Sequence, residues 1–494
     1  MTYWNSCPTV SKRFDYEQHF EKIRQSDAFN EENRIPYTKA IVLMSLFTFV
    51  FLGAEFLFVN MISRTVSGDR SVNAQNYALG ISAIGFVLYP VFSRFCKGKW
   101  QTALAMCAAI LSAICLFVIC RHASYAQILG MGLLLFLILG AFGSAVFYKT
   151  LCLLEDNTYI ARLTGVSYML GILLQIANNN LVHIDYIEAG ILSAFILLLA
   201  FMLIKAEKNS VVPAFSKSKT KEENDESGKD SLKIILLLVL FIALMTCIFS
   251  TMDNAVTAYH ANGTVNIGQW PRILLALSGL MAGFLFDIAG RKYMSVIMYC
   301  VMLLSTTCLV IIQFAGPFTV GLVIFYLSAG FFAVFFTTAF MEIARYTDTP
   351  ELWSGFGRTV NNFVAAAISG GSLALLHSEN NIVMITIELI LFVAISIVAL
   401  FYTNKREALF DRLAEADSSE LSDGEKLQRL AEQFSLTQRE TEVFGLLVNT
   451  EDGLQTIADG LYVSRRTLER YVSAIYEKTG AKSRIGLVTL YNNV

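Results

Sequence analysis

Basic side chains gather at the start of one candidate helix near the C-terminus. Ser464 is a residue type that favours the capping position before a helix, and Gly480 would end the same helix. Arg465, Arg466 and Arg470 would be exposed at its N-terminal end. Guanidinium groups bind phosphates and the major-groove edge of guanine. The pattern predicts contact with double-stranded DNA rather than catalysis.

Three short helices would hold this basic segment. Thr437 and Glu440 have the spacing of a capping box and would start the first helix. Residues 455–460 would form the second helix, and residues 461–463 the turn before the third. The inward side of the third helix is apolar, with Leu468, Val472, Ile475 and Tyr476. This is a helix-turn-helix, whose second helix would enter the major groove N-terminus first.

The segment from Leu436 onward resembles the LuxR-type DNA-binding domain. The resemblance rests on Leu436-Thr-Gln-Arg439-Glu440, Leu446-Leu447, Ile457-Ala458, Leu461-Tyr-Val463-Ser464, Thr467-Leu468, Ile475-Tyr-Glu-Lys478-Thr-Gly480 and Ser483-Arg484. We expect DNA contacts from Ser464, Arg465, Arg466, Thr467, Arg470, Tyr471, Lys478 and Arg484. The resemblance also implies a homodimer, formed through the last helix at residues 483–491. Glu469 stands where the family usually has a basic residue.

The rest of the chain has the composition of a membrane protein. Of its 494 residues, 55% are hydrophobic and 16% are charged, and the mean hydropathy is +0.54. Soluble domains carry about 25% charged residues. Twelve apolar runs, most of them near or above the ~18 residues that a span requires, would cross a bilayer as helices. They lie at about residues 39–61, 77–95, 100–120, 124–148, 160–181, 185–204, 233–257, 270–287, 293–313, 317–341, 354–375 and 381–402.

Lysine and arginine are distributed unevenly between these runs. With the N-terminus inside, 21 of them fall on internal segments and helix edges, and four fall on external ones. Positive residues are enriched on the cytoplasmic side of membrane proteins. We therefore predict that both termini are cytoplasmic and that the protein spans a bacterial inner membrane.

Changes in composition divide the chain into six parts. These are a cytoplasmic tail (1–37), six spans (38–204), a charged cytoplasmic connector (205–231), six further spans (232–403), linker helices (404–435) and the DNA-binding domain (436–494). The connector is expected to be disordered because it is charged and poor in aromatic residues. The linker helix is expected to break at residues 417–420. An offset of 193 residues takes Lys99 to Lys292 and Tyr77 to Trp270, which indicates a 6+6 parallel repeat.

The turn between the eighth and ninth runs reads Gly283-Phe-Leu-Phe-Asp287-Ile-Ala-Gly290-Arg291-Lys292. Gly283 allows close helix approach, Asp287 can cap or pair at the turn, and the basic pair anchors it on the cytoplasmic side. With twelve spans and the repeat, this turn resembles the signature of the major facilitator superfamily over residues 38–403. The corresponding turn of the first half, residues 90–99, lacks the acidic residue, which argues against active transport.

Polar side chains within the spans are candidate ligand contacts, because an ionisable group in a bilayer is costly. The candidates are Glu55, Asn60, Asp253, Arg358, Asn361 and Glu388. Further amides would come from Gln175, Asn178, Asn179 and Asn362. A polar, acidic cavity open to the outside would suit a ligand that offers hydrogen-bond donors or positive charge. The alternative is that these groups satisfy one another between helices.

These patterns favour one function and leave two alternatives. The favoured hypothesis is an all-α, membrane-embedded one-component transcription regulator, which senses a small molecule in its bundle and binds promoter DNA. The second is a secondary transporter with a regulatory appendage, and the third is a scaffold with neither activity. The chain shows no nucleophile elbow, phosphate-binding loop, dinucleotide fingerprint or metal-ligand spacing, so we expect no enzyme activity, cofactor or metal.

Overall fold

The computed structural model describes residues 31–121, 124–154, 159–209, 223–263, 270–315, 318–378, 381–420, 423–450 and 452–492. Contacts divide the chain into two compact units, Met1–Asn404 and Lys405–Val494. All regular elements in the described ranges are helices, as the sequence predicts. Backbone groups in a bilayer have no water to bind, so a helix, which pairs them internally, is the structure expected of the apolar runs.

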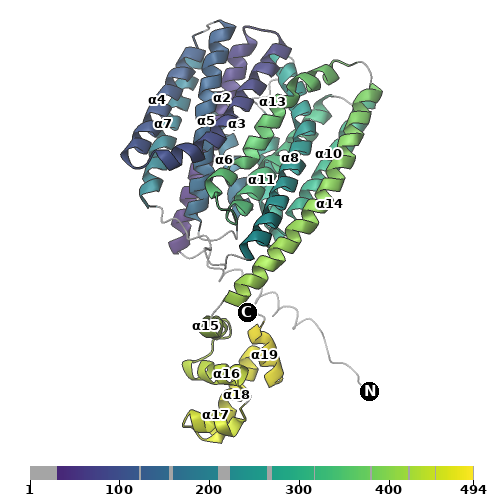
Figure 1. The fold of residues 1–494 in the computed structure, drawn as a ribbon. Coiled ribbons are helices and arrows are strands. Elements are labelled where there is room, and N and C mark those ends of the chain that lie inside the picture. The colour runs from purple at the N-terminus through teal and green to yellow at the C-terminus, as the bar shows by residue number, and fades with distance from the viewer. Residues whose placement is uncertain are drawn as a thin grey trace, which may run out of the picture. The chain divides into compact units, whose positions relative to one another are not determined.

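The first unit contains two sets of six long helices, the last of which continues past Asn404 into the second unit (Figure 1). The first set is α2 (Glu31–Ser63), α3 (Gly68–Phe95), α4 (Lys99–Ile119), α5 (Tyr125–Leu153), α6 (Ile160–Leu181) and α7 (Asp185–Asn209). The second set is α8 (Glu223–Ala261), α9 (Pro271–Phe286), α10 (Met294–Ala315), α11 (Phe318–Ala344), α13 (Phe356–Leu376) and α14 (Asn381–Glu420). Two short elements, η2 (Ile288–Arg291) and α12 (Pro350–Trp353), lie at turns of the second set.

Each predicted span coincides with one of these twelve helices. Within the described residues, ten helices are long and apolar enough to cross a membrane, and two shorter apolar segments are Pro271–Phe286 and Met294–Thr306. The chain is therefore a multi-pass membrane protein.

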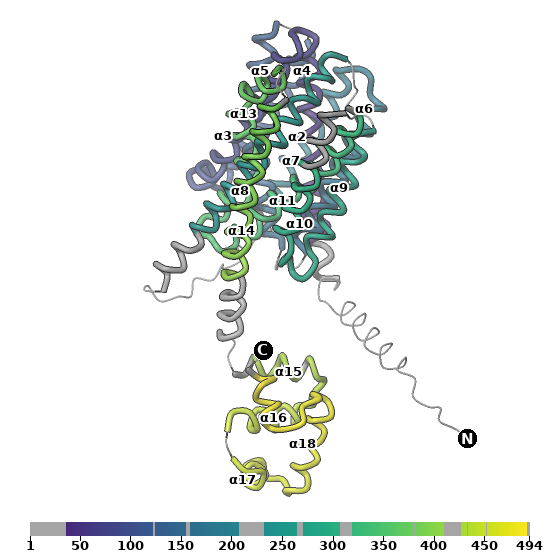
Figure 2. The backbone as a smooth tube through the Cα atoms, turned by 90° about the vertical axis from the view of Figure 1, so that its right-hand side faces the viewer, coloured from purple at the N-terminus to yellow at the C-terminus, as the bar shows by residue number. Residues whose placement is uncertain are grey.

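The two halves meet along two helix pairs, α3 with α13 and α6 with α9 (Figure 2). Small residues permit the second contact. A Cβ atom at Gly283 would lie 2.7 Å from the carbonyl oxygen of Ala161 and 3.0 Å from the Cα atom of Gly165. Glycine at these positions lets two backbones approach more closely than any larger residue would allow.

Several helices extend beyond the spans predicted for them. Helix α2 already begins at Glu31, inside the predicted tail. The connector is helical at its two ends, as continuations of α7 to Asn209 and of α8 from Glu223, and residues 210–222 lie outside the described residues. Helix α14 continues through the predicted break to Glu420. Glutamate, lysine and alanine are good helix formers, and α2 and α8 continue through Pro36 and Gly228 in their extensions.

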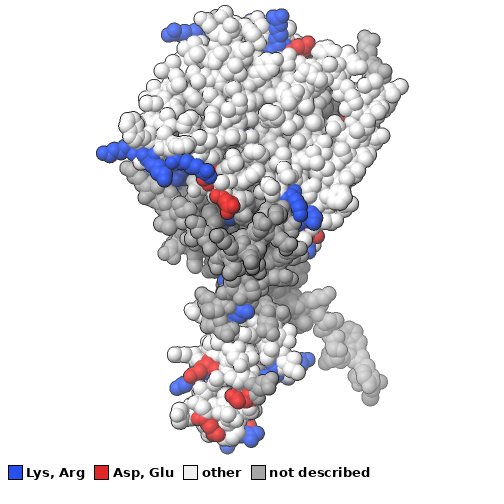
Figure 3. Space-filling view, in the orientation of Figure 1, with Lys and Arg blue, Asp and Glu red and all other residues white. Residues whose placement is uncertain are grey.

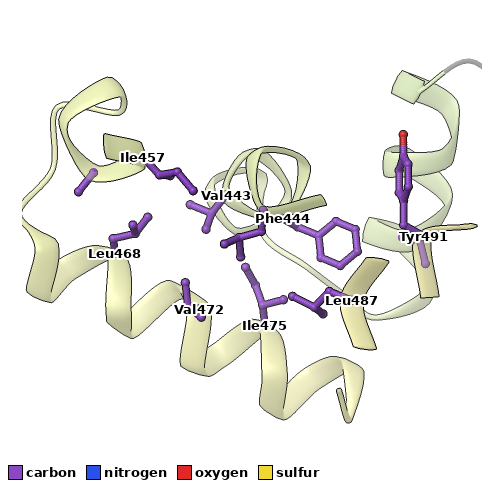
Figure 4. Close-up of a cluster of buried hydrophobic side chains, with 11 residues drawn as sticks. Val443, Phe444, Ile457, Leu468, Val472, Ile475, Leu487 and Tyr491 are labelled. Carbon is purple, nitrogen blue, oxygen red and sulfur yellow. The ribbon is translucent and has the colours of Figure 1, made fainter. Parts of the chain in front are cut away.

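The second unit has a core of its own (Figure 4). Its helices are α15 (Asp423–Gln433), α16 (Gln438–Asn449), α17 (Leu454–Gly460), α18 (Arg465–Thr479) and α19 (Arg484–Asn492). Phe444 from α16, Leu468 and Ile475 from α18, and Leu487 from α19 are at most 1% exposed. Burial of this apolar surface orients the outer face of α18 away from the core.

Candidate functional site

Helix α18 begins and ends as its sequence predicts. The Ser464 hydroxyl accepts a hydrogen bond from the Thr467 backbone N–H at 3.2 Å. Gly480 ends the helix in the left-handed conformation, with φ of 71°. The turn from α17 places Tyr462 at φ of 53°, with its side chain almost fully exposed. Together, α17, this turn and α18 form a helix-turn-helix.

The exposed face of α18 carries Arg466 and Arg470, four residues apart and therefore on one side of the helix. Arg465 is exposed too, and its Nε donates to the Glu469 carboxylate at 3.0 Å. The acidic residue that departs from the family pattern is thus partly neutralised within its own helix. Thr467 and Tyr471 are half-buried beside this face.

Lys478 and Arg484, which the sequence places among the DNA contacts, bind groups within the domain. The Lys478 ammonium donates to the Glu440 carboxylate at 2.7 Å and to the Ser435 carbonyl at 3.0 Å. The Arg484 guanidinium donates to the carbonyls of Leu447, at 2.8 Å, and Asp452, at 2.6 Å. A third donor of Arg484 binds the carbonyl of Thr450. These two side chains hold α18 and α19 against α16 and its following loop.

The Glu440–Lys478 pair predicts how the domain responds to acid. The hydrogen bond from Lys478 lowers the pKa of the Glu440 carboxyl below its ordinary value, and the bonds with Thr437 act in the same direction. A group with a lowered folded-state pKa stabilises the fold above its unfolded pKa and loses that contribution as pH falls through the folded value. The melting temperature of the segment 405–494 should therefore fall as the pH drops below about 4.3, the ordinary glutamate value.

Thermal unfolding followed by circular dichroism tests this. Glu440→Gln should flatten the decline in melting temperature, whereas Glu442→Gln, at an exposed residue paired with Arg439 at 2.7 Å, should leave it intact. An unchanged pH profile in Glu440→Gln would contradict the assignment.

A second group of polar side chains lies inside the helix bundle. Glu55 of α2 accepts a hydrogen bond from the Gln75 amide of α3 at 2.7 Å, and its charge acts on Asp253 of α8 and on Arg358 of α13. Arg272 of α9 also acts on Asp253. Glu55, Asp253, Arg272 and Arg358 are all half-buried. We call these four residues the mixed-charge cluster.

Aromatic rings surround the cluster. The Arg358 guanidinium lies 5.5 Å from the centre of the Phe51 ring and 5.3 Å from that of Phe336. Arg272 lies 5.7 Å from the Phe56 ring. Cations over aromatic faces are stabilised by the ring quadrupole. The polar group that the sequence predicts to be acidic thus contains two carboxylates and two guanidinium groups.

The remaining candidate residues fall in other places. Asn60 binds His260 of α8, with 2.9 Å between its Oδ1 atom and the imidazole Nε2. Asn361 belongs to a polar chain in which Thr246 donates to it at 3.3 Å and it donates to Asn362 at 3.1 Å. Glu388 lies on α14. Asn361 thus fits the alternative of polar packing between helices better than Asp253 or Arg358 does.

Sequence reasoning misses Arg272, Gln75 and two tyrosines, Tyr168 of α6 and Tyr326 of α11, whose hydroxyls lie within the electrostatic reach of the cluster. The sequence places Arg272 at an external helix edge because it follows Trp270 and Pro271 at the start of a run. Its Nη1 donates to the Gln175 amide oxygen at 2.8 Å. A single arginine just inside an apolar run is the signal that could have identified it.

The signature turn joins the two halves at the other end of α9. The Asp287 carboxylate accepts hydrogen bonds from the backbone N–H groups of Ala161, at 3.3 Å, and Arg162, at 2.7 Å, at the start of α6. Arg291 donates to Asp287 at 3.2 Å and to Glu342 of α11 at 2.7 Å. A carboxylate at a helix N-terminus is favoured by the helix dipole. We call this arrangement the Asp287 latch.

Comparisons with known proteins agree with both parts of the chain. Residues 434–491 match the family described as bacterial regulatory proteins, luxR family. A comparison with curated proteins finds no match. In the described residues, no group of three or more His, Cys, Asp or Glu is placed to hold a metal ion.

Three solved structures share the fold of the bundle, each over 75% of this chain. The E. coli fucose:proton symporter superposes with a TM-score of 0.51 at 14% identity and 98% coverage of its own chain. A bacterial homologue of the iron transporter ferroportin, in an outward-facing state, gives 0.52 at 12% identity and 99% coverage. An auto-inhibited peptide transporter of the POT family gives 0.52 at 11% identity and 96% coverage. The chain thus joins a LuxR-type helix-turn-helix domain to a membrane bundle with the fold of the major facilitator transporters.

Proposed function

We propose that this protein is a one-component transcription regulator of the bacterial inner membrane, with both termini in the cytoplasm. One observation carries the proposal: a LuxR-type DNA-binding domain and a transporter-like bundle share a single polypeptide. The bundle binds a small molecule, and the domain binds promoter DNA as a homodimer through α19.

The mixed-charge cluster is the proposed ligand site. Its four charged residues come from α2 and from α8, α9 and α13, so a ligand held there contacts both halves. Two carboxylates and two guanidinium groups suit a small polar molecule that has both hydrogen-bond donors and acceptors, while the nearby rings of Phe51, Phe56 and Phe336 suit an apolar portion.

The Asp287 latch can be closed, with the two halves joined at this end, or open, with the halves apart. If the halves separate at this end, Asp287 loses two backbone donors and α6 loses its cap. A ligand shifts such an equilibrium only by its difference in affinity for the two states, and a shift from 1:99 to 99:1 needs about 10⁴-fold. Since α14 leads directly into the second unit, a change in the bundle can reach the DNA-binding domain along the chain.

The proposed DNA interface is the outer face of α18, with Arg465, Arg466 and Arg470 as the charged contacts. Ser464, Thr467 and Tyr471 lie at its N-terminal end and beside it. Lys478 and Arg484 support this face through their bonds within the domain, so we assign them a positioning role.

A reporter placed under the promoters that flank the gene tests the proposal. Arg358→Gln removes a charge from the cluster and should change reporter output by about twofold to thirtyfold, the range of a 0.5–2 kcal/mol coupling. Arg121→Gln, at an exposed residue next to the end of α4, removes the same charge elsewhere and should have no effect. Equal outputs from wild type and Arg358→Gln, at equal protein levels, would count against sensing through the cluster.

A secondary transporter with a regulatory appendage is the second candidate, favoured by the complete signature turn at Asp287 and the charges in the bundle. Deletion of residues 417–494 separates the two functions. Substrate uptake that survives the deletion would favour the transporter, whereas loss of reporter response without any uptake favours the regulator.

A further inference from the structure

An apolar crevice with a cavity volume of about 120 Å³ lies within the first half of the bundle, and its lining includes no residue of the mixed-charge cluster. It is enclosed by α3, α4, α5 and α7, and its lining includes Phe92, Ala105, Ile138 and Leu203. Phe92 and Leu104 in the lining are 45% and 44% exposed, so the crevice reaches the surface of the bundle.

The basic end of this crevice distinguishes it from an ordinary packing gap. Lys149 of α5 is part of the lining. Cys96 and Gln101 also line it, and the turn between them holds the exposed residues Lys97 and Lys99. Arg94 nearby forms a 3.7 Å ion pair with Glu351. Figure 3 shows Lys and Arg side chains projecting at the left edge of the bundle.

Aromatic side chains place this end at the membrane interface. Phe95 and Trp100 flank the same turn and are 83% and 80% exposed. Tryptophan is enriched at the level of the lipid headgroups. The positive-inside pattern assigns the turn to the cytoplasmic side, where basic pockets between spans bind anionic headgroups.

We propose that the crevice binds one anionic phospholipid from the cytoplasmic leaflet. An acyl chain occupies the apolar space between α3, α4, α5 and α7. The phosphate lies against Lys149 and the Lys97–Lys99 turn. This site is independent of the proposed regulatory function, because it uses residues of neither the cluster nor the DNA-binding domain.

Native mass spectrometry of the full chain in neutral detergent tests the site. The protein is mixed with equal amounts of phosphatidylglycerol and phosphatidylcholine that carry identical acyl chains. A lysine near a membrane surface contributes about 1 kcal/mol of attraction to anionic lipid, so phosphatidylglycerol should be retained at least about fivefold over phosphatidylcholine. Equal retention of the two lipids would overturn the proposal.

Two variants separate the contribution of the Lys149 charge from that of the apolar space in the crevice. Lys149→Gln should lower the preference for phosphatidylglycerol about fivefold and leave retention of phosphatidylcholine unchanged. Ala105→Trp fills the crevice and should abolish selective retention, while Ala103→Trp, at an exposed position on the same helix outside the lining, should behave as wild type. Wild-type selectivity in Ala105→Trp, or displacement of the lipid by glycerol phosphate alone, would overturn the proposal.

Discussion

Replacing both Arg466 and Arg470 with alanine is expected to lower the affinity of the protein for promoter DNA by about 30-fold to 3 × 10⁴-fold. The two side chains share the exposed face of α18, and a guanidinium that contacts a base is worth about 1–3 kcal/mol. If either arginine binds phosphate instead, the slope of log affinity against log salt falls by about one for each phosphate that is no longer bound. Fluorescence anisotropy with labelled duplex DNA, repeated at several salt concentrations, measures both quantities.

A matched control removes the same charge elsewhere in the domain. Arg429 and Arg439 are exposed on α15 and α16, outside α18, and their double alanine variant should bind DNA within a few-fold of wild type. Equal drops in affinity in the two double variants would mean that net charge alone determines binding. Unchanged affinity after Arg466→Ala and Arg470→Ala would exclude α18 as the recognition helix.

The second large effect, a loss of stability, is expected from a substitution where the two halves meet at α6 and α9. Gly283→Ala introduces a Cβ atom 2.7 Å from the Ala161 carbonyl oxygen and 3.0 Å from the Gly165 Cα atom, both of them backbone atoms that cannot turn aside. Overpacking of this kind costs about 1–3 kcal/mol. We expect the melting temperature of the purified full chain to fall by several degrees and the Asp287 latch to weaken, because α6 and α9 must move apart.

Gly370→Ala is the control for this change. Gly370 also lies within a helix, α13, but a Cβ atom there would meet no other atom within 4 Å. Alanine is favoured over glycine in a helix by up to about 1 kcal/mol, so this variant should melt at the same temperature as wild type or higher. A stable Gly283→Ala protein would show that the helices are less closely packed than the structure indicates.

Much of the fold follows from local patterns. The twelve apolar runs coincide with helices because hydrophobic length determines which segments can span a bilayer. The caps at Ser464 and Gly480 are equally local, and the sequence predicts them at the correct residues. The ends of α8 and α14 are not predictable in this way, because a charged segment has the same composition whether it is an extended helix or an unstructured connector.

The candidate sites depend on interactions that spacing does not reveal. Lys478 binds Glu440 across 38 residues of sequence, so its role inside the domain appears only in the folded chain. Arg272 joins Glu55 and Asp253 through the meeting of the two halves. Single residues such as Asp253 can be selected as candidates from their cost in a bilayer, but the balance of charges around them cannot be predicted from the sequence.

Lys478 and Arg484 bind groups within the domain, and Arg465 pairs with Glu469. The outer face of α18 therefore carries little excess positive charge. Affinity for arbitrary DNA rises with the number of phosphates that a protein neutralises, so this domain should hold non-cognate sequence weakly and leave it quickly. Under the proposed function, the DNA-binding domain is tethered to the membrane and meets only the chromosomal sites that diffuse to it. Short-lived non-cognate binding would then keep the domain available for its promoter sites and would not hold long stretches of the chromosome at the membrane.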